Sequence, residues 1–196
     1  MAEHTLRLVS GSAPRRRGPV VPSGILAMMV VVAVESMIFA GLVSAEIVVK
    51  ATAKTWPPPG EPLLPTHETL FNTGALLLSG VVLWLALRIF KTDPQRARGP
   101  LVATLLLGTF FVVFQGVEWV ALLRQGLTLT SSTLGSFFYL IIGLHGLHAV
   151  IAIAALGFMV VRLFQDRLPA NHLQTVSVFW FFVVGLWPFL YWQIYP

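Results

Sequence analysis

Long apolar runs constrain this chain more than any other feature of its sequence. Five segments of 20 or more predominantly apolar residues account for most of its 196 residues, and they are 24–49, 69–90, 100–123, 134–164 and 173–195. A helix needs about 20 residues to cross roughly 30 Å of hydrocarbon. A single helix also satisfies its own backbone hydrogen bonds in lipid. The sequence therefore predicts an all-α, integral membrane five-helix bundle over residues 23–196, preceded by a polar, flexible segment over residues 1–22.

The composition excludes several other classes of protein. Hydrophobic residues make up 56% of the chain and charged residues only 11%, whereas soluble domains have about 25% charged residues. Because there is no cysteine, thiolate metal sites and thioether-linked haem are excluded. The net charge of +5 does not indicate nucleic-acid binding, because the basic residues cluster at the ends of the apolar segments.

The distribution of lysine and arginine predicts the orientation of the bundle. Ten of these residues lie in the N-terminal segment and in the loops 88–99 and 162–172, and three lie on the other side, at Lys50, Lys54 and Arg124. Positive residues are enriched on the cytoplasmic side of membrane proteins. We therefore expect a cytoplasmic N-terminus and a periplasmic C-terminus, in the inner membrane of a bacterium.

Three ionisable residues fall near the middle of their spans. Glu35 lies about eleven residues into the first apolar segment, His145 lies eleven residues into the fourth, and His148 follows one turn later on the same helix face. Ionisable groups at this depth cost roughly 3 kcal/mol or more and are functional-site candidates by default. They form a predicted central polar site, which either bonds two helices together or handles protons or a lipid headgroup.

A second polar patch is predicted in the third span, from Gln115 and Glu118. The simpler interpretation of Glu118 is a helix-end carboxylate that reaches water, and Glu46 has the same interpretation.

Close helix packing is expected in the second and fourth spans, where small or polar residues occur. The residues concerned are Asn72, Ser79, Gly143 and Gly146. The aromatic residues Trp187, Tyr191, Trp192 and Tyr195 at the outer end of the last span fit an interfacial belt.

The histidine distribution argues against haem and metal in this chain. Only His145 and His148 are intramembrane, and both lie on one face of one helix. A bis-histidine haem needs ligands from opposed helices, and a metal centre needs three or four ligands. We therefore expect no haem and no metal in this chain.

Five motifs occur in order and resemble those of one membrane-protein family. They are the stretch around Glu35, the Trp-Pro-Pro-Pro-Gly loop 56–60, Asn72-Thr73 with the Leu-Leu-Ser-Gly at 77–80, the Gln-Gly-Val-Glu-Trp at 115–119, and the segment 135–148 that ends in Gly-Leu-His-Gly-Leu-His. Together they resemble subunit III of the haem–copper oxidases (cytochrome c or quinol oxidases), in a short five-helix bacterial form without the first two of the family's seven helices.

The last helix departs from that family. The family usually has His and Asp where this chain has Phe181 and Val184, while both flanking tryptophans, Trp180 and Trp187, are retained. This departure suggests a divergent branch, and a subunit III-like accessory protein of a nitric oxide reductase is an alternative. A small proton channel or transporter is the alternative from another class.

The resemblance implies a non-catalytic subunit of a respiratory terminal oxidase that couples electron transfer to O2 with proton pumping. It implies that haem and copper lie in a separate subunit I, that subunit II is also present, and that phospholipid binds in the bundle. It further implies that Glu35, His145 and His148 form the central site in support of proton uptake, with Gln115 and Glu118 second.

Overall fold

The structure, a computed structural model, describes residues 22–62 and 64–195, so the predicted flexible segment 1–22 lies outside the described residues except for Pro22. The described residues form five helices and no strand. The helices are α1 (Ser23–Thr52), α2 (Thr66–Phe90), α3 (Arg98–Arg124), α4 (Thr133–Phe164) and α5 (Ala170–Ile194). All five are long and apolar enough to cross a membrane, which confirms the predicted all-α five-span architecture.

The helix ends extend slightly beyond most of the predicted spans. The largest differences are the starts of α2 at Thr66 and α5 at Ala170, each three residues earlier than expected, and the end of α1 at Thr52 rather than 49. Apolar runs mark the hydrocarbon, whereas a helix continues into the polar interface. Pro65 and Pro169 immediately precede α2 and α5, and proline is tolerated at a helix start because its missing N–H would be unpaired there.

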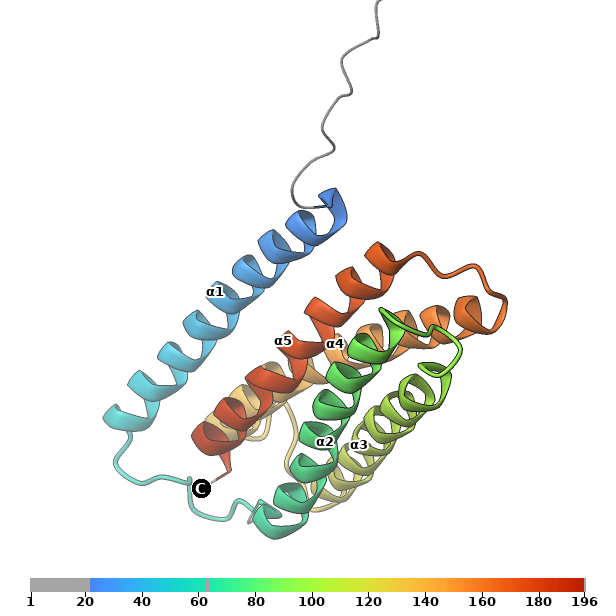
Figure 1. Cartoon of the computed structure of the whole chain (residues 1–196). Coiled ribbons are helices and arrows are strands. Elements are labelled where there is room, and N and C mark those ends of the chain that lie inside the picture. Colours follow the sequence, from blue (N-terminus) through green and yellow to red (C-terminus); the bar gives the residue numbers. More distant parts are fainter. Residues whose placement is uncertain (1–21, 63, 196) are drawn as a thin grey trace, which may run out of the picture.

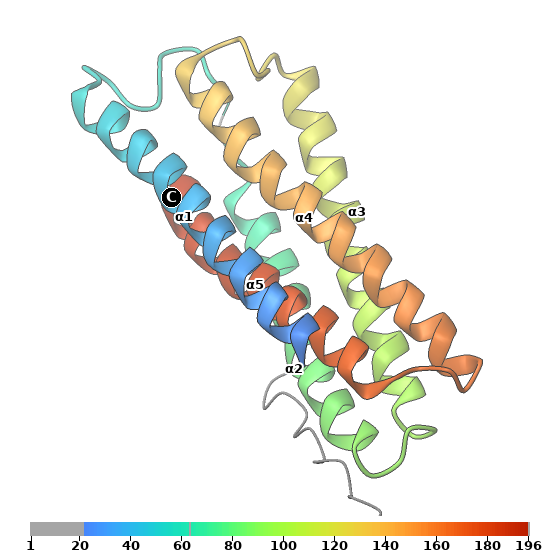
Figure 2. The ribbon, with the colours of Figure 1, turned by 90° about the horizontal axis from the view of Figure 1, so that it is seen from above.

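Helix α5 occupies the centre of the bundle. It packs against α1, α2 and α4, while α3 packs against α2 and α4. Helix α1 contacts only α4 and α5 and lies at one edge of the bundle (Figures 1 and 2). In the most apolar stretch of α1 only 6% of the residues are buried, whereas 44% are buried in the corresponding stretch of α5. Groups on α5 are therefore enclosed by protein, whereas most of α1 faces lipid or a partner.

Two tryptophans of α5 form the middle of the core. Trp180 and Trp187 are both fully buried. Gly108 of α3 allows Trp180 to fit, because a Cβ atom at this glycine would lie 2.5 Å from Cη2 of the indole ring. Gly80 of α2 plays a similar role opposite Val184 of α5, where a Cβ atom would lie 3.1 Å from Cγ1. Small residues thus let three helices approach closely.

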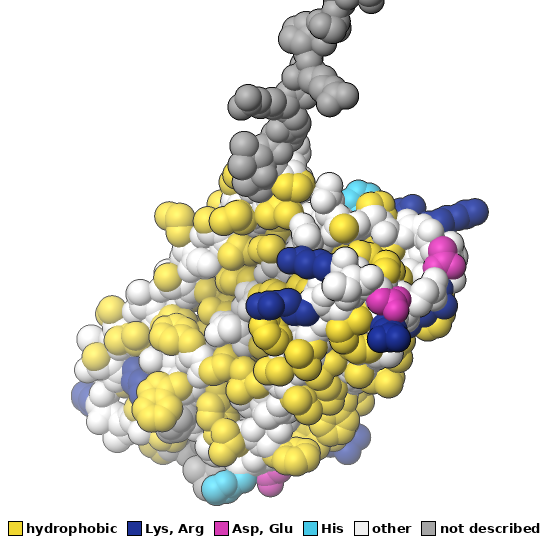
Figure 3. Space-filling model, viewed as in Figure 1, with side chains coloured by type: hydrophobic (Ala, Val, Ile, Leu, Met, Phe, Trp, Pro, Cys, Tyr) yellow, Lys and Arg dark blue, Asp and Glu magenta, His cyan; other side chains and the backbone are white. Residues whose placement is uncertain are grey.

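The surface is mainly apolar, with basic side chains gathered at one end. Figure 3 shows lysine and arginine side chains over the end that carries the α2–α3 and α4–α5 loops, above a broad apolar flank. These two loops are joined by Arg98 Nη2, which lies 3.0 Å from Asp166 Oδ1, and by Gln95 Nε2, which donates to the same oxygen at 2.6 Å. The chain ends on the opposite side of the bundle from the start of α1 (Figure 1).

We predict that Gly108→Ala destabilises the bundle by about 1–3 kcal/mol, because the added methyl group must displace the Trp180 ring from a filled core. The measurement is thermal unfolding in detergent, followed by tryptophan fluorescence. Gly74→Ala is the matched control, since a Cβ atom at Gly74 of α2 meets no atom within 4 Å. Equal unfolding temperatures for the two variants would show that Gly108 is not a packing requirement.

Candidate functional site

The pair Glu35 and His148 joins α1 and α4, which contact each other less than either contacts α5. Glu35 Oε2 lies 3.1 Å from Nε2 of His148, and the two side chains are 23% and 10% exposed. Between described residues of α1 and α4 this is the single polar side-chain contact. Glu35 lies about 18 Å along α1 from Ser23 at 1.5 Å per residue, so the pair is deep within the span.

The hydrogen bonds of His148 determine where its protons lie. Nδ1 of the ring is 2.7 Å from the carbonyl oxygen of Leu144, and a carbonyl can only accept, so Nδ1 carries a hydrogen. A neutral ring then has a bare Nε2, which must accept a hydrogen bond from a protonated Glu35 carboxyl group. The other possibility is an imidazolium paired with a carboxylate. In both forms the pair shares one proton and has no net charge, which lowers its cost in the membrane.

His145 does not join this pair, although sequence spacing placed it on the same helix face. Its ring lies 5.1 Å from the Trp187 ring of α5, at an interplanar angle of 31°. Its Nε2 atom is buried and has no hydrogen-bond partner. Phe39 of α1 packs edge-on against both histidines, with ring centroids 6.3 Å from His145 and 5.6 Å from His148. The predicted central site is therefore divided into a Glu35–His148 pair and a separate His145 environment.

The second predicted patch is a buried cluster, not a water-exposed helix end. Glu118 is 8% exposed and Gln115 is 5% exposed. Gln115 Nε2 donates to Glu118 Oε2 at 2.8 Å and to the hydroxyl of Tyr195 at 3.0 Å. The expectation that Glu118 reaches water is wrong, because α2 and α5 cover this face of α3. We call Thr69, Gln115, Glu118 and Tyr195 the outer polar cluster.

Thr69 indicates the protonation state of the outer polar cluster. Its Oγ1 lies 2.9 Å from Glu118 Oε2 and 2.7 Å from the carbonyl oxygen of Pro65. One hydroxyl hydrogen cannot serve both acceptors. Both Thr69 contacts are satisfied when Thr69 donates to Pro65 and a protonated Glu118 donates to Thr69, whereas Glu118 Oε1 has no hydrogen-bond partner. A neutral carboxyl group also avoids the cost of an isolated buried charge.

Glu46 is also buried rather than exposed to water. It is 3% exposed, and Gln193 Nε2 of α5 donates to its Oε2 atom at 2.9 Å. The sequence interpretation of Glu46 as a helix-end carboxylate in water is therefore wrong. This bond joins the C-terminal part of α1 to the end of α5, whereas Glu35 joins the middle of α1 to α4.

A hydrogen bond between α2 and α5 had no counterpart in the sequence analysis. Trp187 Nε1 donates to Thr73 Oγ1 at 2.8 Å, and Thr73 in turn donates to the carbonyl oxygen of Thr69 at 2.7 Å. The spacing of Thr69 and Thr73, one turn apart with Asn72 between them, was the available signal for a polar face of α2.

Two of the aromatic residues predicted to form an interfacial belt lie in the core instead. Trp187 and Tyr195 are 0% and 5% exposed, so their predicted place in the belt is wrong, while Trp192 is 76% exposed.

The residues expected to support helix packing behave differently from one another. Asn72 is fully buried and donates from Nδ2 to the carbonyl oxygen of Phe111 at 3.0 Å. Ser79 is buried and bonds within its own helix, to Leu76. Gly146 allows Trp119 to lie against α4, since a Cβ atom there would be 2.8 Å from the indole ring. Gly143 makes no close approach, because a Cβ atom there would meet nothing within 4 Å.

Within residues 22–62 and 64–195, no group of three or more His, Cys, Asp or Glu side chains is placed to hold a metal ion. Glu35 and His148 alone provide two ligands, and the remaining position of His148 is taken by Leu144. The Glu35–His148 pair can take part in proton transfer and hydrogen bonding.

The chain was compared with known proteins. A family described as cytochrome c oxidase subunit III matches residues 15–196. The chain is 34% identical over 145 residues to cytochrome c oxidase subunit 3 of Coturnix japonica, which covers 71% of this chain and 54% of that protein. The corresponding proteins of Oryctolagus cuniculus and Gallus gallus are 33% and 34% identical over the same shares. The chain spans about half the length of the curated relatives it matches.

We predict that Thr73→Val destabilises the bundle by about 1–3 kcal/mol, because the buried indole N–H of Trp187 loses its acceptor. The same substitution at Thr109 of α3 is the control, since its exposed hydroxyl bonds only to Leu105 of its own helix. Thermal unfolding and the tryptophan emission maximum measure the effect. A Thr73→Val protein as stable as Thr109→Val would contradict the assigned role of this bond.

Proposed function

Because the chain belongs to the cytochrome c oxidase subunit III family, we propose that it is a non-catalytic subunit of a respiratory terminal oxidase complex. In this proposal haem and copper lie in a separate subunit I, with subunit II also present, and electron transfer to O2 is coupled to proton pumping. The chain stabilises subunit I and supports proton uptake. The family match over residues 15–196 supports this assignment.

The Glu35–His148 pair is the observation within the chain that carries the proton-uptake part of the proposal. The two side chains share one proton and remain neutral overall, so the proton can move between Oε2 and Nε2 without creating net charge in the membrane. His148 is buried, and the 23% exposure of the Glu35 side chain gives this proton access to the surface. The outer polar cluster lacks such access, and we assign it a role in holding α2, α3 and α5 together.

The membrane setting of the chain follows from its five spans and its basic residues. The chain is a multi-pass membrane protein. We infer a bacterial inner membrane, with the end that carries the α2–α3 and α4–α5 loops in the cytoplasm, because lysine and arginine gather there. Exposed apolar side chains along α1, such as Val34, Met37 and Val48, require lipid or partner contact, and we propose that phospholipid packs against this exposed face of α1.

A small proton channel or an accessory protein of a nitric oxide reductase is not favoured by the family match. A channel also requires a connected polar path across the membrane. Here the neighbours of the two histidines include apolar and aromatic rings: Phe39 packs against His148, and Trp187 packs against His145.

We predict that Glu35→Gln leaves the complex assembled and its haem absorbance unchanged but slows proton uptake. The amide can still hydrogen-bond to His148, but it cannot exchange a proton at that position. Glu35→Ala loses the bond as well and weakens the packing of α1 against α4 by about 0.6–1.7 kcal/mol, from the mean to the largest value measured for hydrogen bonds between membrane helices. Co-purification with a haem-bearing subunit, absorbance spectra and proton uptake by reconstituted complex are the measurements.

The control is Glu61→Gln, in the exposed loop between α1 and α2, which removes one carboxylate outside the membrane spans. Purification of the chain as a colourless, autonomous oligomer that conducts protons in liposomes would refute the oxidase assignment. Normal proton uptake by the assembled Glu35→Gln complex would refute only the role of the carboxyl group in proton uptake. The pair would then serve as a hydrogen bond between α1 and α4.

A further inference from the structure

The imidazole ring of His148 is contacted by groups from three helices. Its Nδ1 atom lies 2.7 Å from the carbonyl oxygen of Leu144 in its own helix, and its Nε2 atom lies 3.1 Å from Oε2 of Glu35. Two aromatic rings also pack against it, those of Phe39 of α1 and Phe179 of α5, with centroids 5.6 Å and 6.0 Å away. Each ring nitrogen has one bonding position, so neither is left open to a water molecule.

The two aromatic rings come from opposite sides of the Glu35–His148 pair along the bundle. The starts of α1 and α5 lie together, because a Cβ atom at Gly24 would be 3.0 Å from Oγ1 of Thr175. From this contact, Phe179 is four residues along α5 and Glu35 is eleven residues along α1, which correspond to about 6 Å and 16 Å. Phe39 follows Glu35 by one further turn. The backbone of Phe179 therefore lies toward the end with the basic loops, and that of Phe39 toward the opposite end.

A third phenylalanine holds these two rings in place. The ring centroid of Phe182 lies 6.4 Å from that of Phe179, at an interplanar angle of 27°, and 6.5 Å from that of Phe39. Phe39 and Phe179 are 1% and 8% exposed. We call Phe39, Phe179 and Phe182 the phenylalanine cluster. Interiors packed in this way hold few voids large enough for water, so the cluster keeps the ring of His148 dry.

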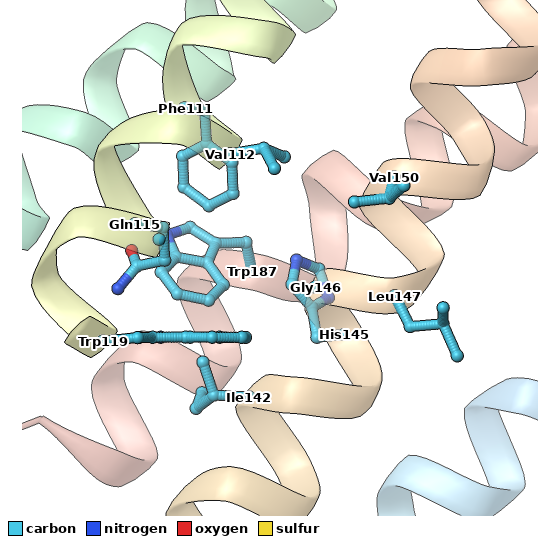
Figure 4. Close-up of a pocket in the computed structure, with 11 residues that line it drawn as sticks. Phe111, Val112, Gln115, Trp119, Ile142, His145, Gly146, Leu147, Val150 and Trp187 are labelled. Atoms are coloured by element: carbon cyan, nitrogen blue, oxygen red, sulfur yellow. The ribbon is translucent and has the colours of Figure 1, made fainter. Parts of the chain in front are cut away.

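His145, three residues earlier on α4, lies in a different setting. Figure 4 shows its ring beside Trp187, at a pocket of about 210 Å³ between α3 and α4. Gln115 and Trp119 also line this pocket, and their Oε1 and Nε1 atoms, like Nε2 of His145, are buried without a hydrogen-bond partner. No carboxyl group lines the pocket, so His145 has no acid there with which to share a proton. It serves below as a buried reference for His148.

We propose that Phe39 and Phe179 are positioning residues that make the carboxyl group of Glu35 the single route by which a proton reaches His148. This inference rests on the proposed role of the pair in proton uptake. Phe179 excludes water that comes from the end with the basic loops, and Phe39 excludes water from the opposite end. Every exchange at Nε2 then passes through Oε2 of Glu35, the more exposed member of the pair.

Truncation of one ring should open a second route to His148. A buried phenylalanine replaced by alanine leaves a cavity, because the surrounding structure relaxes only in part. Water occupies a cavity that offers it two or more polar partners, and Glu35 and His148 provide two beside Phe179. A water molecule at this position can give its proton to Nε2 directly. Phe179→Ala should therefore make the carboxyl group of Glu35 dispensable, whereas loss of a merely structural ring should add to the damage.

The first test measures access of water to each histidine in the purified complex in nanodiscs. In heavy water the Cε1 hydrogen of a histidine exchanges slowly for deuterium where water reaches the ring, and mass spectrometry of peptide fragments detects it. In the unmodified chain we expect exchange at His67 and His172, which are exposed, and none at His145 and His148. In Phe179→Ala we expect exchange to appear at His148, with His145 unchanged.

The matched control is Phe181→Ala. Phe181 is two residues from Phe179 but lines a groove between α2 and α5 with Leu77 and Trp84, so its loss should leave His148 unexchanged. Phe179→Leu keeps most of the apolar volume and should also protect His148. If Phe179→Ala does not assemble, Phe179→Val carries the same expectation. Exchange at His148 in the unmodified chain, or equal exchange in Phe181→Ala and Phe179→Ala, would overturn the proposal.

The second test measures proton uptake by the reconstituted complex. We expect Glu35→Gln alone to slow uptake, the double variant Phe179→Ala/Glu35→Gln to recover the rate of the unmodified complex, and Phe181→Ala/Glu35→Gln to remain slow. A Phe179→Ala/Glu35→Gln complex as slow as Glu35→Gln would show that the ring does not control the route. Glu35→Gln by itself reports on the proposed function, so its normal uptake refutes that role independently of the double variant.

Discussion

The packing of Trp187 in the centre of the bundle is the contact on which the other arrangements depend. Its indole N–H donates to Thr73 of α2, and its ring lies 5.0 Å from Phe111 of α3 and 5.1 Å from His145 of α4. One side chain of α5 thus joins three other helices. Because hydrocarbon offers no water to pair with a buried N–H group, the hydrogen bond to Thr73 sets the rotation of α5 relative to α2.

The two polar sites differ in how closely protein surrounds them. The outer polar cluster lies between α2, α3 and α5, and its members bond mainly to one another, so it acts as a fixed part of the bundle. The Glu35–His148 pair lies between α4 and the peripheral helix α1, and the Glu35 side chain stays 23% exposed while His148 is buried. A proton shared at the edge of a bundle can be exchanged, whereas one enclosed in its centre is held. This difference in position supports the division of roles between the two sites.

Much of the fold was predictable, and the errors share a physical cause. The five spans and the depth of Glu35 and His148 followed from apolar runs and residue spacing. Glu118, Glu46, Trp187 and Tyr195 were misplaced because their positions near helix ends suggested water or interface. Distance along a helix determines depth in the membrane, but it does not determine whether another helix covers that face. Each of these residues is covered by a neighbouring helix.

The sequence by itself determined the number of spans, the depth of the ionisable groups and the family to which the motifs point, because hydropathy and spacing depend on the chain alone. The tertiary structure decided that Glu35 pairs with His148 and not His145, and that His145 lies beside a pocket with two other unpaired polar groups. These outcomes depend on the rotation of each helix about its axis. That rotation is set by interhelical contacts such as Gly108 with Trp180 and Thr73 with Trp187, which form only when distant segments pack together.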